Sequence, residues 1–274
     1  MVREITIGQY YYAESVLHRL DPRVKLMGTL IYVIALFILN NILGYVFAAI
    51  ILAALIKLSK VPFKYIVKGL RAVLIVLLLT ISLNLFLTPG IQLVHFWIFT
   101  ITAEGIKTSV FMALRLIMLI MGCSLMTLTT TPNNLTDGLE RSLKFLEVVK
   151  VPVHEIAMMM SIALRFIPIL LEETDKIMKA QAARGADFES GGIIKRAKAM
   201  VPILVPLFVS AFRRANDLAM AMEARCYRGG AGRTKMKPLK YRRADGVSYV
   251  LMAFFLAGVI LISRFGTLPF EVIA

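Results

Sequence analysis

Long apolar runs dominate the chain and determine its expected architecture. Five of them are separated by turn signals or basic stretches, at residues 26–39, 42–56, 72–88, 106–128 and 247–263. A helix needs ~20 mostly apolar residues to cross a bilayer, and the first two runs are a little short of that. Asn40-Asn41 between them favours a tight turn joining two helices over one very long helix. The pattern therefore predicts about five transmembrane helices.

The remaining segments carry different patterns. Residues 91–105 hold His95 and Glu104, and they predict an interfacial loop. Between Thr129 and Ala244 apolar and charged residues are mixed, and three helices are expected there. Their expected ranges are 132–149, 152–185 and 193–228. Gly185 and Gly229-Gly230 are the expected stops of the last two, because glycine accepts the left-handed conformation that ends many helices.

Both long helices of this region are apolar in their first half and polar in their last. Residues 156–171 and 199–212 are hydrophobic enough to resemble membrane spans. Arg165 and the prolines at positions 168, 202 and 206 favour helices lying obliquely at the membrane boundary over a sixth and seventh span. We therefore divide the chain into a membrane region 1–128, a coupling-helix module 129–244 and a final span with the C-terminus, 245–274.

The basic residues indicate which side of the membrane each segment faces. The 274 residues are 58% hydrophobic and carry a net charge of +15. Residues 1–25 hold four Lys and Arg, residues 57–71 hold five and residues 129–244 hold twenty. Cytoplasmic segments of membrane proteins are enriched in these residues, so the N-terminus and the large module are expected in the cytoplasm. Because the basic residues flank or interrupt apolar runs, nucleic-acid binding is disfavoured.

The chain offers little catalytic chemistry. Two cysteines are too few for a disulfide framework, and His154-Glu155 lacks the second histidine of a zinc-protease motif. No catalytic residue, metal site or bound cofactor is therefore expected. No Gly-x-x-x-x-Gly-Lys-Ser/Thr sequence occurs, so any ATP would be bound by partner subunits. Arg115, inside the fourth span, could contact Asn84, contact a partner or extend to the interface, and we assign it no role.

The two long helices of the module end in similar tripeptides, Ala183-Arg184-Gly185 and Ala224-Arg225-Cys226. An arginine at such an end can form a bidentate contact with an acidic groove, and its small neighbours permit close approach. For a single copy, a simple offset of the helix dipole would be the preferred interpretation. The repeated tripeptide favours docking to two similar sockets on a partner.

Several segments resemble the transmembrane T component of energy-coupling factor (ECF) transporters. The segment from Ser15 to Leu26 (SVLHRLDPRVKL) is similar to the N-terminal signature of that family. Thr129–Pro132, Leu164–Pro168 and the two arginine tripeptides are similar to its later motifs. The resemblance extends from about residue 6 to residue 263.

The resemblance implies an all-α polytopic protein of the prokaryotic cell membrane, L-shaped, with two long coupling helices. It also implies a non-catalytic scaffold in an ATP-driven importer of vitamins or other micronutrients. Its partners would be two cytosolic ABC-type ATPase subunits, bound by the two arginine tripeptides, and a membrane-embedded substrate-binding S component. ATP-driven closure would then move the coupling helices and topple the S component.

Methionines gather in the coupling region, including Met158-Met159-Met160. Flexible thioether side chains can repack against partners of different shape. We hypothesise that this triplet contacts S components, although ordinary core filling explains it equally well. A self-sufficient secondary transporter would need polar groups converging at mid-membrane, and an intramembrane enzyme would need a catalytic pair. The apolar runs supply neither, so both alternatives are less favoured.

Overall fold

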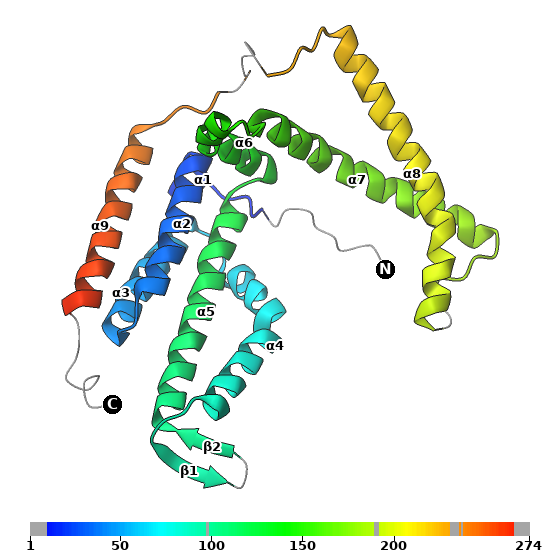
Figure 1. The fold of residues 1–274 in the computed structure, drawn as a ribbon. Helices are drawn as coiled ribbons and strands as arrows, with labels where there is room; N and C mark the ends of the chain where they lie inside the picture. The colour runs from blue at the N-terminus through cyan, green and yellow to red at the C-terminus, as the bar shows by residue number, and fades with distance from the viewer. Residues whose placement is uncertain (1–9, 97–98, 189–191, 231–235, 237, 266–274) are drawn as a thin grey trace. The chain divides into compact units, whose positions relative to one another are not determined.

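In the computed structural model of the protein, the described residues are 10–96, 99–188, 192–230, 236 and 238–265. They form mostly helices (Figure 1). The elements in chain order are α1 Val16–Arg19, α2 Pro22–Ile38, α3 Ile42–Ser59, α4 Phe63–Leu87, β1 Gln92–Phe96, β2 Phe99–Thr102, α5 Ala103–Thr129, α6 Pro132–Ser142, the 3-10 helix η1 Lys144–Val149, α7 Val153–Ala183, α8 Ile193–Ala224 and α9 Arg243–Phe265.

The chain forms two compact units. One joins residues 8–141 with 239–274, so that α9 packs beside α2 although more than 200 residues separate them in sequence (Figure 1). The other contains residues 142–238, with η1, α7 and α8. The expected division of the chain at residues 128 and 244 stays a prediction.

The first unit is a helical bundle built on α2, α3, α5 and α9, with α4 packed against α5. Its core is apolar and includes Leu36, Leu39, Ala48 and Val259, all fully buried. Helices α2 and α3 are separate and are interrupted at residues 39–41, as the Asn40-Asn41 pair predicts. Residues 92–96 and 99–102, expected within an interfacial loop, form the paired antiparallel strands β1 and β2.

A buried carboxylate ties the start of α2 to the start of α9. Asp245, 1% exposed, accepts hydrogen bonds from the backbone N–H of Asp21 at 2.9 Å and of Arg242 at 2.7 Å. Asp21 in turn pairs with Arg23, whose guanidinium lies 3.8 Å from the ring centroid of Tyr241. These contacts satisfy backbone donors that the first turn of a helix leaves without intrahelical partners.

Arg115 closes the connection between α2 and α3. Its guanidinium donates from Nη2 to the carbonyl oxygen of Leu39 at 3.0 Å and from Nε to the hydroxyl oxygen of Tyr45 at 3.0 Å. Leu39 is the C-cap of α2, where a helix leaves carbonyls unpaired. The Arg115 guanidinium thus finds acceptors at the end of α2 and on α3, so no contact with Asn84 or a partner is needed to account for a charged side chain here.

The helices are long and apolar enough for a polytopic membrane protein. Within the described residues, four helices could cross a bilayer by length and composition, namely α3, α5, α7 and α9. Helix α4, bent by 61° near residue 72, would be a fifth. Helix α2, with 17 residues, lies at the short end of the range that spans a bilayer. The protein is therefore an all-α polytopic membrane protein, and the oblique position expected for α7 stays a prediction.

Candidate functional site

Helix α7 ends in a hydrogen-bonded left-handed cap at the first arginine tripeptide. Arg184 is the C-cap residue, with φ −88° and ψ 6°, and Gly185 follows with φ +87°. The Ala186 N–H donates to the carbonyl of Gln181 at 3.0 Å, and the Gly185 N–H donates to that of Ala182 at 2.9 Å. This pair of bonds is a Schellman motif, in which glycine supplies the positive φ without steric cost.

Helix α8 ends in the same way at the second tripeptide. Arg225 is the C-cap residue, with φ −91° and ψ 12°, and Cys226 follows with φ +54°. The Tyr227 N–H donates to the carbonyl of Met222 at 3.0 Å, and the Cys226 N–H donates to that of Glu223 at 2.8 Å. The helix thus ends four residues before the predicted end at Arg228, because Cys226 takes the left-handed position expected of Gly229.

The C-terminal ends of α7 and α8 have the same backbone conformation, and both are exposed to solvent. All residues of the two tripeptides are exposed, namely Ala183, Arg184, Gly185, Ala224, Arg225 and Cys226. A Cβ added at Gly185 would meet no atom within 4 Å. Within the part of the chain that the structure describes, neither arginine forms an ion pair. Both guanidinium groups are therefore available to a partner.

An ion pair at the crossing of α7 and α8 relates the two ends. Arg214 of α8 donates to the carboxylate of Glu173 of α7 at 3.1 Å. Eleven residues separate Glu173 from Arg184, and eleven separate Arg214 from Arg225. Because an α-helix rises 1.5 Å per residue, each arginine lies roughly 16 Å along its helix from the ion pair. The two similar tripeptides thus stand at the ends of two arms of equal length.

The methionine triplet lies near the start of α7 and is only partly exposed. Met159 and Met160 are 58% and 40% exposed. Met158 is half-buried, and its sulfur accepts a hydrogen bond from the hydroxyl of Tyr227 at 3.2 Å. Two of the three side chains can therefore reach a partner, whereas the third packs within its own unit.

The first half of α8 exposes a larger apolar surface that our sequence analysis did not assign to a partner. Its members recur at intervals of three and four residues, a spacing that places them along one stripe of a helix. They are Val201, Leu204, Val205, Phe208, Val209 and Phe212. Together with Leu170 of α7, four of them (Leu204, Val205, Phe208 and Val209) line an open groove. The apolar residues within 199–212 were the available signal, and we interpreted them as part of a helix lying obliquely at the membrane boundary.

Among the described residues no group of three or more His, Cys, Asp and Glu side chains is arranged to hold a metal ion. The chemistry that this site offers is thus two exposed cationic groups and an apolar stripe, which suits binding of protein partners.

Known proteins are similar to this chain over almost its whole length. Residues 13–236 match the family model CbiQ, described as cobalt transport protein. The chain is 55% identical over 266 residues to the energy-coupling factor transporter transmembrane protein EcfT of Clostridium kluyveri, covering 96% of this chain and 98% of that protein. It is 45% identical over 265 residues to EcfT of Bacillus subtilis, covering 96% of this chain and all of the relative. The chain therefore belongs to the EcfT family of energy-coupling factor transporter transmembrane proteins.

Proposed function

We propose that this chain is the coupling subunit of an ATP-driven importer, and that Arg184 and Arg225 dock into two cytosolic ABC-type ATPase subunits. The supporting observation is that two exposed arginines have the same backbone conformation at the ends of two crossed helices. Two similar ATPase subunits would offer two similar sockets, which the similar ends of α7 and α8 would fit. In this proposal the chain itself performs no catalysis, and the ATPases supply the energy.

The chemistry of docking follows from the geometry of the two ends. A guanidinium presents its donors in a planar fork that fits a carboxylate bidentately, and such bonds are stronger than neutral ones. The Schellman motif holds the backbone at each arginine rigid, so docking immobilises little beyond the side chain. Small residues on both sides permit the partner's groove to approach closely.

Movement of the ATPases would be transmitted along the helices. Helices α7 and α8 have 31 and 32 residues, which corresponds to roughly 45 Å each. Except at Pro168, Pro202 and Pro206, which lack an N–H, the interior backbone bonds are satisfied within each helix, so a force at one end displaces the other end as well. If the two sockets approach each other on ATP binding, the two equal arms would rotate about the Glu173–Arg214 crossing.

The stripe on α8, with Met159 and Met160, is the proposed contact for a membrane-embedded S component. A large exposed apolar surface marks an interaction site, and flexible methionine side chains adapt to differently shaped partners. In this proposal the S component selects the substrate, a vitamin or a metal ion. In this proposal the N-terminus and both arginine ends lie in the cytoplasm, which the bias of Lys and Arg supports.

The test is charge reversal at both arginines in cells that also express the ATPases and an S component. The double variant R184E/R225E should abolish ATP-driven uptake and co-purification of the ATPases, with unchanged protein in the membrane. Each single variant should weaken binding of one ATPase. Arg228, exposed and two residues beyond the second tripeptide, provides the matched control, and R228E should retain uptake. Wild-type uptake by the double variant would refute the docking proposal.

A further inference from the structure

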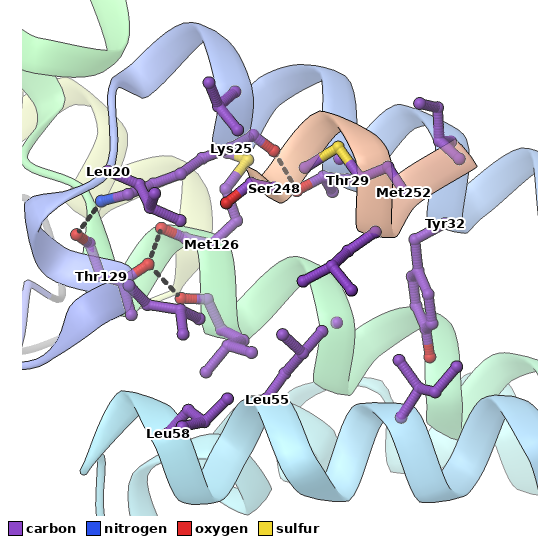
Figure 2. A pocket seen from close by; sticks show the side chains of 18 of the residues that line it. Leu20, Lys25, Thr29, Tyr32, Leu55, Leu58, Met126, Thr129, Ser248 and Met252 are labelled. Carbon is purple, nitrogen blue, oxygen red and sulfur yellow. Dashed lines mark hydrogen bonds between the residues drawn. The ribbon is translucent and has the colours of Figure 1, made fainter. Parts of the chain in front are cut away.

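A cavity opens at one end of the helical bundle of the first unit. Its volume is about 270 Å³, and its walls come from α1, α2, α3, α5 and α9 (Figure 2). It lies where α2 and α9 begin and where α3 and α5 end. Most of its lining is aliphatic, methionine or aromatic. Val16, Leu58 and Leu251 line it and are also more than half exposed, so the cavity communicates with the surroundings of the bundle.

The cavity wall offers little to water. Thr29, Thr129 and Ser248 bring hydroxyls to the lining, and each donates to a carbonyl of its own helix at 2.8–2.9 Å. Tyr32, at the far end in Figure 2, donates to the carbonyl of Met118 at 3.2 Å. A water molecule needs two to four polar partners, and an apolar cavity of about 150 Å³ stays dry and binds benzene. A larger apolar cavity in a membrane protein therefore suits hydrocarbon.

A single cation lies at the polar end of the lining. The ammonium group of Lys25 donates to the carbonyl of Thr129 at 2.8 Å and to that of His18 at 3.4 Å, which leaves one of its three N–H groups (Figure 2). Among the residues that the structure describes, no carboxylate forms an ion pair with it. Figure 2 places this side chain beside Leu20 and Thr129.

The charges around this end of the bundle favour an anion. Arg19 pairs with Glu14, and Arg23 pairs with Asp21, so these four charges offset one another. Lys57 and Lys60 flank Leu58 at the end of α3 and are exposed. Asp245 is buried and accepts two backbone hydrogen bonds, and its negative charge acts on Lys25 and offsets one of the nearby lysine charges. Lys25, Lys57 and Lys60 therefore leave a positive excess near the cavity.

We propose that the cavity binds one acyl chain of an anionic phospholipid, whose headgroup phosphate is held by Lys25. A bilayer supplies this ligand at high concentration beside the open side of the cavity. The bound chain would fill space between α2, α3 and α5 that no side chain fills. It would also link α1 to the bundle, because Val16 and Leu17 form part of the lining.

Photocrosslinking tests this proposal with the full chain in phosphatidylcholine vesicles. The probe is phosphatidylglycerol with a diazirine near the middle of one acyl chain, compared with phosphatidylcholine that carries the same group. Leu52 and Leu125 line the cavity but are only 4% exposed, so only an inserted chain can label them. We expect mass spectrometry to find labels on both, several-fold more from phosphatidylglycerol. Absence of these labels would refute insertion, and equal labelling by both lipids would refute the role of Lys25.

Two variants and a control sharpen the result. Leu55→Trp fills the cavity and should remove most labelling of Leu125, whereas Leu78→Trp on the exposed surface of α4 should not. Lys25→Gln keeps a hydrogen-bond donor without the charge, and it should reduce labelling by phosphatidylglycerol to the level of phosphatidylcholine. Unchanged preference in Lys25→Gln would overturn the proposed headgroup contact. Labelling of the unaltered protein decides the question of insertion even if Leu55→Trp fails to fold.

Discussion

Arg214 and Glu173 form an ion pair of 3.1 Å that joins α8 to α7. Each residue precedes the arginine of its own tripeptide by eleven positions. The pair thus defines the point about which two equal arms could turn. Its side chains are 37% and 28% exposed, so the ion pair contributes little to the free energy of unfolding, and we expect its main effect to be on how α7 and α8 cross.

Reversing one charge of this pair should affect transport more than stability. Glu173→Arg places two cations together. Because the site is partly exposed, we expect the free energy of unfolding to fall by only about 0.5 kcal/mol. ATP-driven uptake should fall, because α7 and α8 would no longer be held together at this point. The combined variant E173R/R214E restores opposite charges and should recover uptake. Arg213→Glu, next to the pair and exposed, serves as the control. Failure of the double variant to recover would contradict this role.

The left-handed cap of α7 predicts that replacing Gly185 by a residue with a Cβ destabilises the end of this helix. Gly185→Ala introduces a Cβ at φ +87°, which should destabilise the last turn by about 1 kcal/mol. Hydrogen exchange at the amides of Gly185 and Ala186 should speed up accordingly. Gly192→Ala is the matched control, because its φ is −70° and an added Cβ meets open space. Equal exchange in the two variants would show that the cap is not rigid.

Arg115 and Tyr45 should be energetically coupled. Removing the guanidinium leaves the carbonyl of Leu39 and the hydroxyl of Tyr45 without this donor, and hydrogen bonds to a charged group contribute about 1.5–3 kcal/mol. Arg115→Ala should therefore lower the thermal midpoint of the purified protein. In the cycle with Tyr45→Phe, the two losses should not add, because the side chains share a bond. Strict additivity would exclude the contact.

The surroundings of the His18 ring predict that the protein loses stability in mild acid. Its Nε2 donates to the carbonyl of Tyr11 at 2.9 Å, so its Nδ1 accepts from the hydroxyl of Ser15 at 2.7 Å. Burial lowers the pKa of His18 below its ordinary value of 6.5, opposed by the bond to Tyr11 and reinforced by the charge of Lys25.

The unfolded chain therefore takes up this proton more readily than the folded one. The stabilisation is complete above pH 6.5 and is lost as the pH falls through the lower pKa of the folded protein. Thermal midpoints measured from neutral pH downward should decline over this range. His18→Asn removes the titrating group, and its midpoint should change less with pH. The same decline in the variant would assign it to other groups.

Much of the fold follows from the order of apolar runs and breaks. The runs at 42–56 and 106–128 lie inside α3 and α5, and Asn40-Asn41 marks the break between α2 and α3. The end of α8 was predicted less well. Gly229-Gly230 is the stronger stop signal, but Cys226 already has φ +54° and completes the cap. Nothing in the identity of a cysteine indicates that conformation, because it depends on the bonds made by Cys226 and Tyr227.

The sequence by itself determined the membrane class, the approximate helices and the two arginine tripeptides, because hydropathy and helix ends are properties of neighbouring residues. Only the tertiary structure decided which distant groups meet. It placed Arg115 on Leu39, Asp245 beside Asp21 and Glu173 on Arg214. Such pairs join residues 41 to 224 positions apart. Their partners are chosen by how helices pack and by which backbone groups the helix ends leave unsatisfied.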